Sequence, residues 1–154
     1  MRKLGWLLKL ALITAIHLPS PAFAESGIVS TKSAHDAETT VDRLTSILDE
    51  KGMRVFTLID HAAGARSVGL ELRPSYVVIF GNPKIGTLLM QCEQQVAIDL
   101  PQKALIYQDQ AGQVWLSYND PSYLAARHQL SGCDAVLKKI STALATFARL
   151  ATQP

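Results

Sequence analysis

Two helical patterns that enclose a run of short β-rich segments limit what this chain can fold into. In the first pattern, Ala37, Val41, Leu44 and Leu48 recur every three or four residues, and Gly52 supplies the stop. The second pattern, near the end of the chain, carries one apolar stripe formed by Val136, Leu137, Ile140, Leu144, Phe147 and Leu150. Each pattern predicts an amphipathic helix with one buried face.

The remaining segments are mostly rich in β-branched and apolar residues and are bounded by turn residues, which is typical of strands. Strands are predicted over residues 27–31, 53–60, 76–80, 96–98, 104–108 and 114–118. Shorter helices are predicted over residues 84–93 and 121–128, and residues 61–73 allow one turn of helix. Ser33 and Asp36 are predicted to cap the first long helix as a pair.

This order predicts an α+β fold with one mostly antiparallel sheet and helices packed on one face. The chain is 48% hydrophobic and 18% charged, which excludes an intrinsically disordered protein. Residues 25–154 contain neither an internal repeat nor a linker, so a single domain is expected there.

Residues 1–24 have the three parts of a secretory signal peptide. Arg2 and Lys3 form the basic start, an apolar run follows, and Ala22-Phe23-Ala24 supplies the small residues that signal peptidase needs. The apolar run is shorter than the roughly 20 residues that span a bilayer. We therefore expect cleavage after Ala24, secretion to a bacterial periplasm, and no membrane anchor after cleavage. The segment removes three basic and no acidic residues, so the overall charge of +2 becomes −1.

Several motifs together resemble the family called domain of unknown function 302. They are GIVSTKS, the LIDH that ends the second strand, YVVIFGNP, IDLPQKALIY and VWLSYNDP, and they cover roughly residues 27–151. The resemblance implies a β-α-β(4)-α fold and a homodimer. It implies no activity, because none is established for the family.

Cys92 and Cys133 are the two cysteines of the chain. An oxidising compartment and an even cysteine count favour a disulfide between them. The alternatives are two separately buried thiols or a redox-active pair. The last is disfavoured because catalytic dithiols normally lie within one turn of helix, as in C-x-x-C.

Four polar residues are candidates for acid/base catalysis: Asp60, His61, Asp99 and Asp120. His61 stands at a predicted strand end and titrates near neutral pH, and a carboxylate beside it would complete a general acid/base pair. The alternative for Asp99 and Asp120, which stand near prolines, is capping of turns or helices. The alternative for His61, an exposed or hydrogen-bonded loop histidine, is the favoured interpretation.

Candidates for ligand binding are His61, Asn82, Tyr118 and His128. No two histidines have the spacing of metal ligands on one helix face, so neither a metal nor a cofactor is indicated. Basic residues are scattered among acidic ones without interleaved aromatics, so nucleic acid is not an expected partner.

Two functions follow from these residues. The first is a non-enzymatic binding module for a small or apolar ligand or a protein partner, because aromatic residues on the strands could border a pocket between sheet and helix. The second is a small envelope hydrolase or other acid/base enzyme centred on His61 with Asp60, Asp99 or Asp120. We favour the first, since the chain lacks the motifs of the common enzyme classes.

Overall fold

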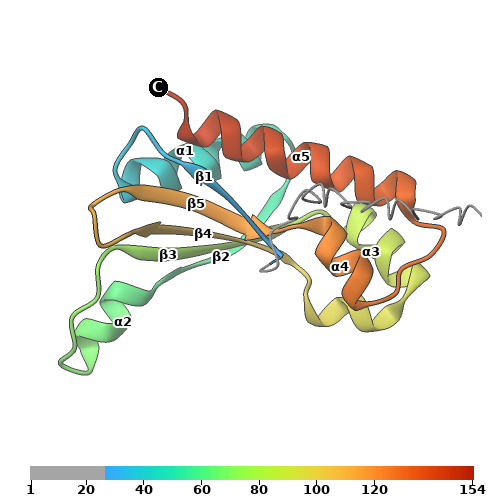
Figure 1. The fold of residues 1–154 in the computed structure, drawn as a ribbon, viewed down its shortest axis with the longest axis horizontal. Helices are drawn as coiled ribbons and strands as arrows, with labels where there is room; N and C mark the ends of the chain where they lie inside the picture. The colour runs from blue at the N-terminus through green and yellow to red at the C-terminus, as the bar shows by residue number, and fades with distance from the viewer. Residues whose placement is uncertain (1–26) are drawn as a thin grey trace, which may run out of the picture.

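The computed structural model describes residues 27–154, so the predicted signal peptide over residues 1–24 lies outside the described residues. The fold is a five-stranded sheet in the order β1-β5-β4-β3-β2, with every neighbouring pair antiparallel (Figure 1). The strands are β1 (Ile28–Lys32), β2 (Arg54–Asp60), β3 (Ser75–Gly81), β4 (Gln102–Gln108) and β5 (Val114–Asn119). This confirms the predicted α+β class.

The helices fall into three groups. Two long helices, α1 (Ala37–Glu50) and α5 (Asp134–Thr152), cover one face of the sheet, as predicted. The short helix α2 (His61–Ser67) projects beyond one end of the strands. At the opposite end lie α3 (Pro83–Cys92), the 3₁₀ helix η1 (Gln94–Ile98) and α4 (Pro121–Arg127).

The core lies between the sheet and the two long helices. Leu44 and Leu48 of α1 are fully buried, as is Phe80 of β3. The rings of Phe80 and Phe147, on α5, meet edge to face with centroids 6.4 Å apart. Each such side chain contributes about 1.5–3 kcal/mol by burial, so the helical stripes read from the sequence are what hold the layers together.

The helix α1 begins at a different cap from the predicted pair. Asp36 is the N-cap, and its Oδ1 accepts a hydrogen bond from the Thr39 backbone N–H at 2.7 Å. Ser33 lies further back, and its hydroxyl bonds the Thr40 hydroxyl at 2.8 Å. Ser33 therefore fixes the approach to the helix rather than capping it.

Residues 96–98 do not form the predicted strand. They belong to η1, where the Glu93 carboxylate accepts a hydrogen bond from the Gln95 backbone N–H and starts the 3₁₀ turn. A strand with one buried face would bury Val96 and Ile98 together. Val96 is fully buried but Ile98 is 73% exposed, so the apolar run misled the prediction.

The second face of the sheet is not covered by α1 or α5. Side chains alternate along a strand, so residues that flank the buried positions point to this face. Val77 and Ile79 of β3, Leu105 of β4 and Trp115 of β5 occupy such positions and are half-buried. Within the described residues 27–154, no helix is long and apolar enough to cross a membrane.

Candidate functional site

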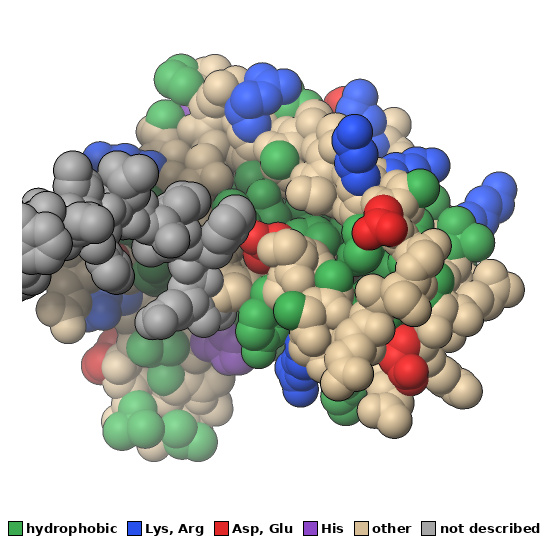
Figure 2. Space-filling view, turned by 45° about the vertical axis from the view of Figure 1, so that its right-hand side comes forward, with side chains coloured by type: hydrophobic (Ala, Val, Ile, Leu, Met, Phe, Trp, Pro, Cys, Tyr) green, Lys and Arg blue, Asp and Glu red, His purple; other side chains and the backbone are tan. Residues whose placement is uncertain are grey.

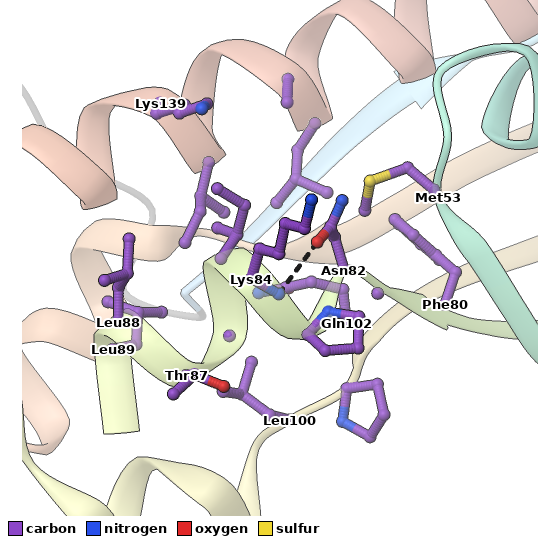
Figure 3. Close-up of a pocket in the computed structure, with 18 of the residues that line it drawn as sticks. Met53, Phe80, Asn82, Lys84, Thr87, Leu88, Leu89, Leu100, Gln102 and Lys139 are labelled. Carbon is purple, nitrogen blue, oxygen red and sulfur yellow. Dashed lines mark hydrogen bonds between the residues drawn. The ribbon is translucent and has the colours of Figure 1, made fainter. Parts of the chain in front are cut away.

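A cavity of about 810 Å³ lies where α3 and α5 meet the end of the sheet (Figure 3). Figure 3 shows Lys139 on α5 on one side and Lys84, Leu88 and Leu89 on α3 on the other. Most of the wall is apolar and is formed by Met53, Phe56, Phe80, Ile85, Leu88, Leu89, Met90, Leu100, Ile140, Ala143, Leu144 and Phe147. Its volume is within the range of small-molecule sites.

The turn after β3 positions one wall of the cavity. Asn82 caps α3, with its Oδ1 accepting a hydrogen bond from the Lys84 backbone N–H at 3.0 Å, and Pro83 occupies the first turn. The Asn82 amide also donates to the Gly52 carbonyl at 3.5 Å. Asn82, predicted as a ligand-binding residue, therefore both lines the cavity and sets the direction of α3.

Small residues keep the cavity open. Gly86 of α3 faces Leu100, and a Cβ at this glycine would still lie 3.9 Å from the Leu100 Cδ1. Ala97 of η1 and Ala143 of α5 also line the cavity. Larger side chains at these positions would project into the space that the apolar wall encloses.

One buried polar group opens onto the cavity. Gln102, at the start of β4, is only 8% exposed and lines the cavity. Among the described residues its side-chain amide has no hydrogen-bonding partner, yet neither amide atom is fully occluded. Because buried amides are normally paired, Gln102 offers a free donor and a free acceptor to whatever enters.

All the charged side chains that line the cavity are lysines. They are Lys51 at the end of α1, Lys84 on α3 and Lys139 on α5, and no Asp or Glu lines the cavity. None of the three forms an ion pair within the part of the chain that the structure describes. A neighbouring groove shares Lys51 and Lys139 and adds Lys138. Figure 2 shows basic side chains along the upper edge of this face, above hydrophobic ones; the acidic side chains visible there do not line the cavity.

The two cysteines lie beside this site. Cys92 ends α3 and Cys133 precedes α5, and the structure brings them to disulfide distance with their Cα atoms 6.6 Å apart. Since α3 and α5 form opposite walls of the cavity, a bond between these residues would hold the walls together.

The predicted acid/base residues Asp60 and His61 lie at the other end of the sheet. β2 runs from Arg54, which pairs with the last residue of β3, to Asp60, which pairs with Tyr76. Asp60 caps α2, accepting a hydrogen bond from the Ala63 backbone N–H at 2.8 Å. His61 is exposed, and its ring has no hydrogen-bonding partner among the described residues.

Asp99 and His128 come together, although they were predicted for different roles. His128 Nε2 lies 2.6 Å from Asp99 Oδ2, and Arg127 Nη1 lies 3.1 Å from Asp99 Oδ1. His128 and Arg127 line a separate shallow pocket with Gln95 and Ile98, which contains no cysteine, serine or threonine as a nucleophile. These hydrogen bonds of Asp99 with Arg127 and His128 connect the end of η1 to the end of α4, which fits a structural role.

Asp120 and Tyr118 complete the predicted set. Asp120 caps α4, where its Oδ1 accepts a hydrogen bond from the Ser122 backbone N–H at 2.8 Å. Tyr118 is buried against the core, and this burial, with the nearby negative charge of Asp120, raises its pKa. In the described residues, no group of three or more His, Cys, Asp or Glu side chains is placed to hold a metal ion.

Of the residues predicted to bind a ligand, Asn82 lines the cavity, and the other polar groups that line it were not predicted from the sequence. Gln102 lies two residues before the strand predicted over residues 104–108, and Lys139 lies beside the apolar stripe of the last helix. A useful signal was available, because a glutamine at an inward-facing strand position is unusual. Of the aromatic residues on the strands, which were expected to border a pocket, Phe56 and Phe80 line the cavity.

The sequence and the fold of this chain were compared with those of known proteins, and both match one family. A family model described as "Domain of unknown function DUF302" matches residues 29–147. The crystal structure of an uncharacterized conserved protein DUF302 from Bacillus stearothermophilus superimposes with a TM-score of 0.74. It covers 82% of this chain and 98% of that one at 18% sequence identity, which supports the fold alone.

Curated relatives are found in Brucella. A protein of Brucella suis biovar 1 (strain 1330) named fluoride-specific ion channel FluC 1 is 41% identical over 134 residues, which are 86% of this chain and 53% of that protein. The protein of that name from Brucella abortus biovar 1 (strain 9-941) is 41% identical over 134 residues, 50% of its length. This chain thus spans about half the length of the curated relatives it matches.

Proposed function

The chain belongs to the DUF302 family, and on that premise we propose that it is a non-enzymatic binding module whose cavity between α3 and α5 takes a small apolar ligand. One observation carries the proposal: a cavity of about 810 Å³ with an apolar wall and a few polar groups. Binding sites for small molecules have this composition, since the apolar wall supplies affinity and the polar groups orient the ligand.

The positions of the predicted catalytic residues favour binding over acid/base chemistry. Asp60 and Asp120 are each engaged as helix caps, and Asp99 is paired with His128 and Arg127. His61 lies at the far end of β2 from the cavity. A general acid/base pair needs its two groups and the substrate within hydrogen-bonding reach of one another.

A neutral fluorescent probe tests the proposal directly. N-phenylnaphthylamine is expected to bind with a rise in fluorescence, and Ala143→Trp is expected to weaken binding at least tenfold by filling the cavity. Ala145→Trp is the matched control, because Ala145 is exposed on the same helix and does not line the cavity. Equal weakening by both variants, or no binding by the unaltered protein, would contradict the proposal.

We also propose that this module acts outside the cytoplasm, as the signal-like residues 1–24 predict. Protein recovered from the periplasm is expected to begin at Glu25. Sequencing of the mature amino terminus checks this, and retention of Met1 in the exported protein would contradict it.

The names of the Brucella relatives suggest a partner. We propose that the matched region accompanies a fluoride-specific channel rather than forming one, because it covers about half of those proteins and its described residues contain no membrane-crossing helix. The purified chain added to liposomes is expected to release no fluoride, whereas the full-length Brucella suis protein in the same assay serves as the positive control. Fluoride release by this chain alone would refute the proposal.

A homodimer is proposed through the second face of the sheet, where Val77, Ile79, Leu105 and Trp115 are half-buried. Apolar side chains on an uncovered face are stabilised by an apolar partner surface. Leu105→Glu is expected to shift a dimer to a monomer in sedimentation velocity, and Ala145→Glu, at an exposed position of α5 on the opposite side of the sheet, is the control for added charge. A monomer in the unaltered protein at every concentration would contradict this proposal.

A further inference from the structure

We propose that the ligand of the cavity is an amphipathic anion, an unbranched apolar chain that ends in a carboxylate or a phosphate. The inference rests on the proposed binding function and adds the charge and shape of the ligand. Two features point to it: the lysines that line the cavity without an acidic partner, and the unpartnered amide of Gln102 inside it.

The three lysines approach the cavity from three different elements. Lys51 comes from the end of α1, Lys84 from the start of α3 and Lys139 from α5, so three elements each bring one positive charge to the lining of the same cavity. Asp49 and Glu50 precede Lys51 in α1, but neither lines the cavity. Unpaired ammonium groups beside an apolar surface favour an anion, because low-dielectric walls strengthen the attraction.

This charge distribution is local and does not follow from the overall composition. Residues 27–154 contain equal numbers of basic and acidic residues. Several of the acidic ones are engaged elsewhere: Asp36, Asp60 and Asp120 cap helices, and Asp99 binds His128. The lining of the cavity is therefore positively charged, although residues 27–154 as a whole carry no net charge.

Gln102 gives the second, independent indication of a ligand. Its side chain is more than nine-tenths buried, opens onto the cavity and lacks a hydrogen-bonding partner among the described residues. An amide N–H in this setting donates readily to an anionic oxygen, and such charge-assisted bonds are stronger than neutral ones. A purely apolar ligand would leave this amide unpaired.

The wall of the cavity suits a flexible chain. Met53 and Met90 line it, and methionine adapts to irregular apolar surfaces because its side chain is unbranched and polarizable. Gly86 leaves room between α3 and Leu100 for such a chain to pass. The tail would lie against these residues while the head group meets the lysines.

Four ligands with one tail and different head groups test the inference. Dodecanoate, dodecyl phosphate, dodecanol and dodecyltrimethylammonium are titrated below their micelle concentrations, each competing with the neutral fluorescent probe. We expect at least one of the two anions to bind about tenfold more tightly than the cation, and the tighter anion identifies the head group. Raising the salt concentration is expected to weaken anion binding and to leave dodecanol binding unchanged.

Matched variants locate the effect. The double variant Lys84→Gln/Lys139→Gln is expected to weaken binding of the tighter anion about tenfold while dodecanol binding stays the same, which also shows that the cavity is intact. Lys32→Gln, on β1 away from the cavity, is the control and is expected to bind both as the unaltered protein does.

The outcomes separate this inference from the proposed function. If dodecanol and the cation bind as tightly as both anions, or the lysine variants leave anion binding unchanged, the anionic ligand is refuted and the apolar binding site stands. If none of the four ligands and not even the neutral probe binds, the proposed function itself fails.

Discussion

The imidazole Nε2 of His128 lies 2.6 Å from the carboxylate Oδ2 of Asp99, which ties the end of α4 to the end of η1. Arg127 holds the other carboxylate oxygen at 3.1 Å. The next residue after Asp99 is Leu100, which lines the cavity. A pair that has the composition of a catalytic dyad thus braces a wall of the cavity.

His128→Ala is expected to lower the free energy of unfolding by about 1–3 kcal/mol, because the part-buried Asp99 carboxylate loses a charge-assisted hydrogen bond. His61→Ala is the control, and the exposed ring of His61 predicts a change within about 0.5 kcal/mol. Urea denaturation followed by circular dichroism measures both. Equal stability of the two variants would contradict the bracing role.

Asp109→Asn is expected to reduce the dependence of stability on acid pH. The Trp115 indole N–H donates to Asp109 Oδ2 at 2.8 Å and, with the backbone N–H groups of Gln113 and Ala111, lowers the pKa of this carboxyl. A lowered pKa stabilises the fold above the unfolded value of about 3.9 and loses that contribution as the pH falls through the folded value.

Urea denaturation at pH 7 and at pH 3 measures the effect. The unaltered protein is expected to exceed Asp109→Asn in stability at pH 7, and the gap is expected to narrow at pH 3. Glu71→Gln is the control, because Glu71 is exposed and forms no hydrogen bond with its side chain among the described residues. If the difference in stability between the unaltered protein and Asp109→Asn is the same at both pH values, Asp109 does not contribute to the acid sensitivity.

Reduction is expected to destabilise the domain if Cys92 and Cys133 are bonded. Closing a loop over a sequence separation of 41 is worth about 4 kcal/mol in the chain-entropy model. The double variant Cys92→Ser/Cys133→Ser should match the reduced protein and should not respond to reductant. Two reactive thiols in protein denatured without reductant would contradict the bond.

Gly27→Ala is expected to destabilise the fold by about 2–4 kcal/mol. Gly27 has a φ of 63°, and a Cβ there would overlap the ring of Tyr123 on α4. Gly52→Ala separates the two effects, since Gly52 has a φ of 66° with open space around it. Thermal unfolding should therefore show a larger loss of stability for Gly27→Ala than for Gly52→Ala. Equal losses of stability would show that overlap with Tyr123 contributes nothing.

Gln102→Met is expected to raise the free energy of unfolding of the ligand-free protein by about 1 kcal/mol, because a buried amide without a partner is costly. The same change should weaken binding of a polar head group and not that of the neutral probe. Gln91→Met, on the exposed side of α3, is the control. A loss of stability in Gln102→Met would show that the amide already has a partner in the native protein.

The sequence predicted the helices and sheet well because their signals are local. The apolar stripe from Ala37 to Leu48 and that of the last helix each fix a buried face, and the run 76–80 fits an interior strand. The segment 96–98 was misjudged because three apolar residues contain no information about the Glu93 cap that turns them into a 3₁₀ helix.

The candidate site was harder to predict because it depends on contacts between distant segments. Asn82 was found through its turn motif, but Lys84 and Lys139 meet only where α3 approaches α5. The pairing of Asp99 with His128 likewise joins residues whose separation is 29 positions. No local sequence pattern indicates a contact between residues so far apart, so Asp99 and His128 were each predicted as site residues without being predicted to pair.

β1 has implications for the order of folding. It pairs with β5 alone, and the Ser30 and Ser117 hydroxyls, 2.7 Å apart, are 87 positions apart in the chain. The loop that follows β1 is held by Thr152, whose carbonyl accepts a hydrogen bond from the Ala34 backbone N–H at 2.9 Å. Closing such long loops carries an entropic cost that slows folding. The first strand can therefore join the sheet only after β5 has been synthesised, and the loop after it is held only once Thr152 is present, whereas β2, β3 and β4 each pair with the strand that follows next in the chain.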